Sequence, residues 1–396
     1  MAEGQRKDIS EKRIDEFVRE VAKTECEIVG ISVHVMAIDV ANRISSALRK
    51  LMPEIKIIYG GPYLSREFLL LSQKNKEILS LDADAYTFGE GEETLSEIVR
   101  NLGLRSEIGN VRGAFIKKDD ALIYCGEREK IIDIDSLPFP DFSDFPPENY
   151  LEKATLPIMF SRGCLNRCSF CRDCALWGKY RARKAQSIFA EMKQQMKSYD
   201  ARNFNCNDLM LNGDLEMLNE LSELIISNGL NVGWGGMAIT REDMSISFLK
   251  KLKQAGCTNM DIGIESGSEK IRRKMGKSPL QIAEKSIRAI HEAGIRVNST
   301  WLIGYPGETR LDFMKTLWFM FKVRKYLSEI ISNVCHIPLE SRLFTEIDKI
   351  GISIKNDSCY DTMRWYLGLN TPREREIRMK IFHKFVHILK ININKQ

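Results

Sequence analysis

The chain has few histidines, no long apolar run and little excess of charge of either sign. Its five histidines do not show the spacing of a histidine metal site. Its apolar runs are far shorter than the ~20 residues that span a bilayer, and the N-terminus lacks the apolar stretch of a secretory signal. We therefore expect a cytoplasmic protein without a membrane span. A net charge of +5 over 396 residues gives no reason to expect nucleic-acid binding.

Cysteine is too sparse for a disulfide scaffold, and it is unevenly distributed. There are ten cysteines in 396 residues. Six are scattered in or near apolar segments, where a small buried side chain is expected: Cys26, Cys125, Cys206, Cys257, Cys335 and Cys359. The other four lie within eleven residues: Cys164, Cys168, Cys171 and Cys174. In a reducing compartment such a cluster indicates a metal site.

Alternating strand and helix patterns predict an α/β fold in two parts. In residues 1–126, three buried-strand patterns and a later hairpin pattern predict an incomplete, flavodoxin-like open parallel sheet. Four prolines in residues 127–154 predict a linker. Six strand–helix units in residues 155–350 predict a partial (β/α)6 TIM-like barrel. Residues 351–396 are predicted to be a helical segment, to which we assign no chemistry.

The four clustered cysteines follow the first strand of the predicted barrel. In barrel-like α/β folds, loops at the carboxyl ends of strands build the active site. Thiolates favour iron–sulfur clusters and zinc. A cubane held by Cys164, Cys168 and Cys171 alone would leave one iron open to a substrate or cofactor. With Cys174 as a fourth ligand the site would be closed, as in an electron-transfer or structural cluster or a zinc site; we favour three ligands.

The sequence resembles the radical S-adenosylmethionine (SAM) superfamily. Cys164, Cys168, Phe170 and Cys171 match its Cys-x-x-x-Cys-x-aromatic-Cys signature. Two further segments resemble its fourth- and fifth-strand motifs, and three N-terminal segments resemble the cobalamin-binding domain that precedes the barrel in one large subgroup. Residues 263–268 resemble the fourth-strand motif, and residues 303–309 resemble the fifth-strand motif. The segments that resemble the cobalamin-binding domain are residues 29–32, 60–62 and 89–94.

The resemblance implies a 4Fe-4S cluster on Cys164, Cys168 and Cys171, with SAM chelating the open iron. An electron from the reduced cluster would cleave SAM to methionine and a 5′-deoxyadenosyl radical, with a ferredoxin or flavodoxin as electron donor. The residues that the resemblance places near SAM are Phe170, Asp208, Arg241, Glu265, Gly304, Pro306 and Gly307. For each the alternative is an ordinary structural role, such as packing, a helix cap, an ion pair or a βα turn.

The N-terminal part departs from the cobalamin-binding pattern. Three parallel strands are counted where five are usual, and no Asp-x-His-x-x-Gly motif is present; His34 lacks that context. If cobalamin binds, the leading reaction is methyl transfer to an unactivated carbon. Without cobalamin, we expect hydrogen abstraction leading to rearrangement, cyclisation or decarboxylation. A methylthiotransferase is disfavoured because no N-terminal cysteine set is visible, and a non-catalytic iron–sulfur or zinc protein is the alternative of another class. The sequence does not indicate the substrate.

Overall fold

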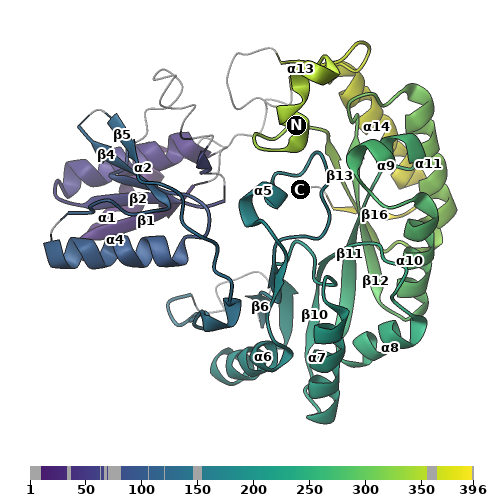
Figure 1. Ribbon diagram of the computed structural model, residues 1–396, viewed down its shortest axis with the longest axis horizontal. Coiled ribbons are helices and arrows are strands. Elements are labelled where there is room, and N and C mark those ends of the chain that lie inside the picture. The colour runs from purple at the N-terminus through teal and green to yellow at the C-terminus, as the bar shows by residue number, and fades with distance from the viewer. Residues whose placement is uncertain are drawn as a thin grey trace. The chain divides into compact units, whose positions relative to one another are not determined.

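The computed structural model describes residues 10–33, 37–62, 64–66, 69, 82–105, 107–119, 121–145, 154–354 and 364–394. His34 and Cys359 lie outside these residues. The chain divides into two compact units, one ending at Ile131 and the other beginning at Ile132 (Figure 1). The predicted linker, residues 127–154, spans this division, and its extent stays a prediction. Among the described residues, no helix combines the length and apolar character needed to cross a membrane.

The first unit contains a five-stranded sheet in the order β1-β2-β3-β4-β5. Neighbouring strands from β1 to β3 are parallel, and β4 and β5 add an antiparallel hairpin. This matches the three parallel strands and the hairpin predicted from sequence. The strands are β1 (Ile28–Ser32), β2 (Lys56–Gly60), β3 (Ala85–Thr87), β4 (Ala114–Lys118) and β5 (Ala121–Tyr124), and the helices described are α1 (Glu11–Ala22), α2 (Ile38–Leu51) and α4 (Glu92–Arg105).

The second unit contains a parallel seven-stranded sheet in the order β16-β13-β12-β11-β10-β9-β6. Its strands are β6 (Thr155–Ile158), β9 (Asn203–Cys206), β10 (Gly233–Ala238), β11 (Cys257–Glu265), β12 (Arg296–Ile303), β13 (Glu329–Val334) and β16 (Asn392–Asn394). The first six follow one another in sequence, as a partial (β/α)6 barrel requires. The prediction of that fold is confirmed.

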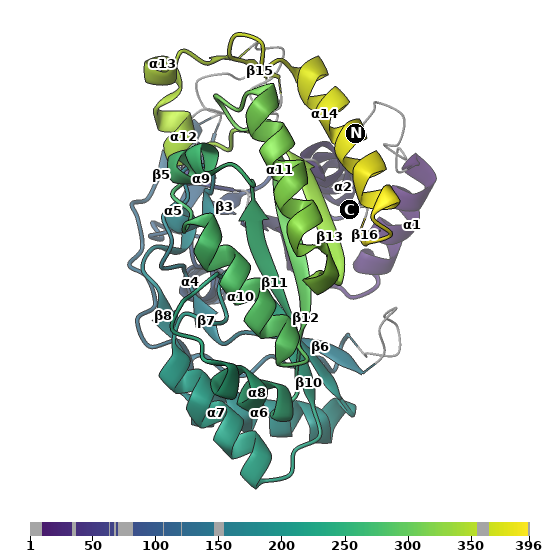
Figure 2. The same ribbon diagram turned by 90° about the vertical axis from the view of Figure 1, so that its right-hand side faces the viewer.

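Helices connect these strands and cover one face of the sheet (Figures 1 and 2). They are α6 (Ala185–Tyr199), α7 (Leu215–Ser227), α8 (Ile246–Gln254), α10 (Leu280–Glu292) and α11 (Arg310–Val323). On β11, Met260, Ile262 and Ile264 are buried in the core beneath them. Because side chains alternate along a strand, Asp261 and Glu265 lie on the opposite face. The inner face is therefore polar where the site forms.

The C-terminal segment corrects one expectation. Residues 351–396 were predicted to be helical, and α14 (Pro372–Ile388) is a helix, but β16 pairs parallel with β13 as a seventh strand. Ile391, Asn392, Ile393 and Asn394 alternate apolar and polar side chains as a half-buried strand does, so the sequence carries a short strand signal that the prediction missed. The remaining short elements are η2 (Ile134–Ser136), β7 (Ser161–Arg162), α5 (Asp173–Trp177), β8 (Arg181–Ala182), α9 (Glu269–Met275), η4 (Arg324–Tyr326), α12 (Arg342–Thr345), α13 (Ile347–Ile350), β14 (Ser353–Ile354) and β15 (Trp365–Tyr366).

Candidate active site at the carboxyl ends of the barrel strands

The four clustered cysteines lie on one loop that is closed at its base. We call residues 163–180 the cysteine loop. The strands that flank it, β7 and β8, pair with each other in antiparallel fashion. Gly163 has a φ of 83°, and a Cβ there would lie 2.6 Å from the carbonyl oxygen of Lys179. Only glycine fits this close approach of two backbones.

Ser169 fastens the middle of the cysteine loop to three other segments. Its N–H donates to the Met275 carbonyl at 2.9 Å, and its carbonyl accepts from the Leu343 N–H at 2.7 Å. Its hydroxyl lies 2.7 Å from that of Tyr305. The side chain is buried, so these bonds are shielded from water. The loop therefore has a fixed frame between Cys168 and Cys171.

The thiols of the cysteine loop are free and partly accessible. Cys164, Cys168, Cys171 and Cys174 are all half-buried and form no disulfide. Burial raises the pKa of Cys164 and Cys168, whereas a contact with Cys171 lowers the pKa of Cys174 to about 7. The donor set, thiols gathered on one loop, has the chemistry that iron–sulfur clusters take. Within the described ranges, no three His, Cys, Asp or Glu side chains are arranged to hold a single metal ion.

Glu265 occupies a strained position beside the cysteine loop. It ends β11 with a φ of 67°, a left-handed conformation that is rare outside glycine and is often found at functional sites. Its Oε1 lies 3.4 Å from both Lys277 Nζ and Thr300 Oγ1. The side chains of Glu265 and Lys277 are only 12% and 10% exposed, respectively. The positive charge of Lys277 also acts on Cys168, where it opposes the rise in pKa caused by burial. Sequence reasoning missed Lys277, a single lysine in a loop without a motif.

The predicted residues Gly304, Pro306 and Gly307 lie in the turn between β12 and α11. We call residues 304–309 the glycine turn. Gly304 has a φ of 83°, and a Cβ there would overlap the side chain of Arg375. Asn370 Nδ2 donates to the carbonyl oxygens of Gly304 and Tyr305 at 3.0 and 3.1 Å. The turn is thus held from the C-terminal segment, to which sequence analysis assigned no chemistry.

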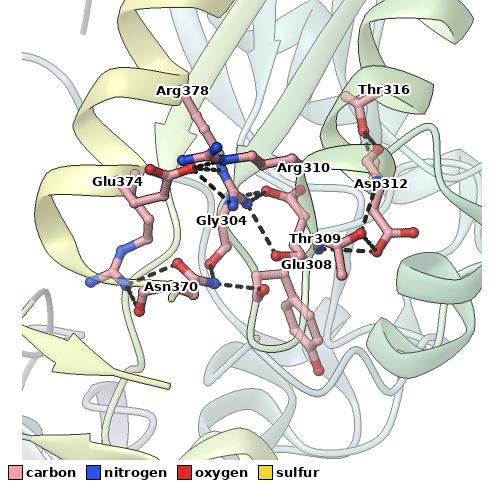
Figure 3. A network of polar contacts seen from close by, with 12 residues as sticks. Gly304, Glu308, Thr309, Arg310, Asp312, Thr316, Asn370, Glu374 and Arg378 are labelled. Atoms are coloured by element: carbon pink, nitrogen blue, oxygen red, sulfur yellow. Dashed lines mark hydrogen bonds and ion pairs between the residues drawn. The ribbon is translucent and has the colours of Figure 1, made fainter. Parts of the chain in front are cut away.

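Helix α14 supplies an ion pair that closes the glycine turn (Figure 3). Arg378 Nη1 lies 2.8 Å from Glu308 Oε2, which also accepts from the Gly304 N–H at 3.0 Å. Both charged side chains are at most 5% exposed. Burial raises the pKa of Glu308 to about 7, against the opposing effect of Arg378. Glu308 lay within the predicted fifth-strand motif, but its partner is 70 residues away and could not be identified from sequence.

Asp208 and Arg241 lie at the same edge but bond to the protein itself. The Asp208 carboxylate accepts from the Phe160 N–H at 3.0 Å and from the Ser161 hydroxyl at 2.5 Å. Burial raises its pKa to about 6. Arg241 pairs with Asp243 at 2.6 Å and donates to two carbonyls of the loop after β9. These contacts fit positioning roles at the base of the site, and a cofactor contact from either residue stays a prediction.

Phe170 packs against an apolar cluster beside the cysteine loop. The buried members of that cluster include Met275, Leu302, Tyr305 and Trp365. The structure therefore supplies the packing alternative for Phe170, and its predicted adenine contact is untested. Of the scattered cysteines, Cys206, Cys257 and Cys335 are buried as expected, whereas Cys26 and Cys125 are half-buried.

Residues 158–320 match the model of the radical SAM superfamily, which covers the cysteine loop, β11 and the glycine turn. This segment is therefore a radical SAM domain, and enzymes of that superfamily use a 4Fe-4S cluster and SAM. The resemblance stated from the sequence is confirmed.

Curated relatives carry several different activities. An uncharacterized methyltransferase of Pyrococcus horikoshii is 25% identical over 76% of this chain and 66% of its own length. The anaerobic magnesium-protoporphyrin IX monomethyl ester cyclase of Synechocystis is 24% identical over 73% of this chain and 58% of its own. A putative methylthiotransferase of Methanocaldococcus jannaschii is 26% identical over 72% of this chain and 66% of its own length. The chain thus spans less than two thirds of the length of these relatives.

Two solved structures share the fold over most of the chain. The radical SAM methyltransferase TsrM of Kitasatospora setae superposes with a TM-score of 0.71 at 17% identity, covering 85% of this chain and 67% of that one. The cobalamin-dependent SAM radical enzyme OxsB superposes with a TM-score of 0.67 at 16% identity, covering 96% of this chain and 55% of that one. At this identity the likeness establishes the fold.

Proposed function

We propose that this chain binds a 4Fe-4S cluster through Cys164, Cys168 and Cys171, cleaves SAM, and transfers a methyl group to an unactivated carbon with the help of cobalamin. The observation that carries the proposal is the set of accessible thiols on a loop fastened at Ser169, within a radical SAM domain. When bound, the cluster would supply the electron that breaks a sulfur–carbon bond of SAM.

The residues around the cysteine loop would bind and orient the nucleoside. Glu265, which has a strained backbone and lies 3.4 Å from Lys277, can accept a hydrogen bond from the amino group or the ribose of SAM. Lys277 would offset the negative charge of the cluster thiolates. Gly304, Pro306 and Gly307 would offer backbone to the adenine, because glycine permits close approach. Phe170 would pack beside it.

The cobalamin part of the proposal concerns the first unit. The carboxyl ends of its parallel strands carry small residues, Ser32, Gly60, Gly61 and Thr87, at the edge where open α/β sheets bind ligands. TsrM and OxsB have been solved with cobalamin bound. One observation favours hydrogen abstraction without cobalamin as the second candidate: the described residues of this unit contain only three parallel strands.

An anaerobic reconstitution tests these functions in one sample. The full chain is loaded with iron and sulfide, reduced with dithionite and given SAM, and 5′-deoxyadenosine and methylated products are measured. Any reductive cleavage of SAM supports the cluster proposal, whereas none from an intact cluster would favour a non-catalytic protein. Cobalamin is then added, and its absorption in the protein fraction after gel filtration decides between methyl transfer and cobalamin-free chemistry. We further propose a ferredoxin or flavodoxin as physiological electron donor and a cytoplasmic location.

A further inference from the structure

Helix α11 exposes a stripe of large apolar side chains. Leu311, Met314, Trp318 and Phe321 are 66%, 57%, 67% and 37% exposed. Their spacings of three and four residues place them along one side of the helix. The opposite side, which includes Phe313, Leu317 and Met320, already packs in the core. Core packing therefore does not account for the outward stripe.

Helix α14 extends the same surface. Ile377, Ile381 and Ile388 are 44%, 46% and 64% exposed and lie on one side of that helix. The two helices pack side by side, and both face the viewer in Figure 2. We call the seven apolar residues together the two-helix face. An exposed apolar surface of this kind marks an interaction site on a folded protein.

The charges around the two-helix face are mostly positive. The other exposed positions of α11 are Arg310, Lys315 and Lys322. Arg310 pairs with Glu374 at 3.2 Å and Lys322 with Glu284 at 2.6 Å. The acidic residue of α11, Asp312, is buried and paired with Lys270. On α14, Lys380 and Lys384 lie among the isoleucines, and Glu376 is an exposed acid.

The apolar stripe and the lysines around it together indicate which kind of partner fits the two-helix face. Trp and Phe rings flanked by lysines, whose long stems reach past apolar surface, are typical of helices that lie at a membrane interface. A second copy of the chain would bring two positive rims together, which disfavours self-association. Trp318 and Phe321 are stacked with ring centroids 5.7 Å apart, forming a single aromatic projection suited to the headgroup layer.

We propose that the two-helix face binds peripherally to a lipid surface rich in anionic headgroups. Neither helix spans the bilayer in this arrangement. The apolar stripe would enter the headgroup boundary, and the lysines would meet lipid phosphates. The proposal does not depend on the reaction, since none of these residues belongs to the candidate active site.

Vesicle flotation of the full chain tests the proposal. Phosphatidylcholine vesicles are compared with vesicles that also contain phosphatidylglycerol. We expect binding to the anionic vesicles that weakens as salt is added. The double variant Met314→Gln/Trp318→Gln should bind the anionic vesicles at least about tenfold more weakly, because it removes two inserted apolar side chains. Leu104→Gln, at a 75% exposed residue of α4, is the matched control and should bind like the wild type.

Fluorescence and sedimentation give the outcomes that would overturn it. Trp318 is 67% exposed, Trp177 is half-buried, and Trp234, Trp301 and Trp365 are at most 1% exposed. A blue shift that reports insertion of the two-helix face should therefore disappear in Trp318→Phe, which keeps Trp177. The proposal is overturned by absence of binding to either vesicle, or by equal binding to uncharged vesicles at every salt concentration. A dimer in sedimentation velocity that is lost in the double variant would assign the face to a second copy. Capture by an acidic protein without vesicle binding would also reject the lipid surface.

Discussion

The cysteine loop and the glycine turn lie at the same edge of one sheet, yet they are built in opposite ways. In the glycine turn, Asn370 and Arg378 reach in from the C-terminal segment and bond to backbone and carboxylate groups that are almost wholly buried. In the cysteine loop, Ser169 is fastened in this way, but the neighbouring thiols stay partly accessible. We interpret the buried bonds as the frame of the candidate site and the accessible thiols as the part proposed to hold a ligand.

Removing a thiol should give the largest effect on function and almost none on folding. In Cys168→Ala we expect loss of cluster incorporation and of SAM cleavage, because two thiolates cannot hold the cubane. The iron content after anaerobic reconstitution and the yield of 5′-deoxyadenosine are the measurements. Unchanged circular dichroism would show that the frame survives.

Cys174→Ala is the matched control on the same loop. It should keep the cluster and the cleavage activity, because three ligands suffice in the proposed site. If Cys174→Ala lost its iron as Cys168→Ala does, the cluster would have four cysteine ligands and no open iron for SAM.

Breaking the buried ion pair of the glycine turn should instead lower stability. Arg378→Met leaves Glu308 buried without its cation, which costs about 3–5 kcal/mol of unfolding free energy. The loss should be smaller at pH 5 than at pH 8, because the pKa of Glu308 is about 7 and the neutral acid needs no cation. Urea unfolding at both pH values measures it.

Arg310→Met is the surface control for this experiment. Arg310 also bonds to Glu374, at 3.2 Å, but its side chain is 85% exposed. Its loss should cost less than about 1 kcal/mol. If the two variants lost the same unfolding free energy, burial would not make the Arg378–Glu308 pair more important for stability than an exposed pair.

The contrast between the two loops also explains what sequence could predict. The six barrel strands and the cysteine set follow from local apolar patterns and short spacings, which sequence displays directly. The frame residues do not: Ser169 and Tyr305 are 136 residues apart, and Glu308 and Arg378 are 70 apart. A serine or arginine acquires such a role only when the fold brings its partner to it. Single sequences carry no signal for that pairing.

Asp208 holds the base of the cysteine loop and should make stability depend on pH. Burial raises its folded pKa from 3.8 to about 6, so the folded chain binds its proton more tightly than the unfolded chain does. The stabilisation of the folded chain by protonated Asp208 is fully present below pH 4. It is lost as the pH rises through about 6, which lowers the unfolding free energy by up to about 3 kcal/mol. The unfolding free energy of wild type minus that of Asp208→Asn should therefore fall between pH 4 and 7; a flat difference would contradict the assignment.

The smallest expected effect tests whether the frame of the cysteine loop matters for the ligand. Ser169→Ala removes a buried hydroxyl that contacts the Tyr305 hydroxyl and the Lys274 carbonyl, which costs about 1 kcal/mol of stability, but it keeps the two backbone bonds of residue 169. We expect normal iron content and a several-fold higher KM for SAM, because a looser loop holds the open iron less well against the nucleoside site. Tyr305→Phe removes the same contact between the two hydroxyls from the glycine turn and should give the same change. If KM rose in one variant and not in the other, the hydroxyl pair would not couple the two loops.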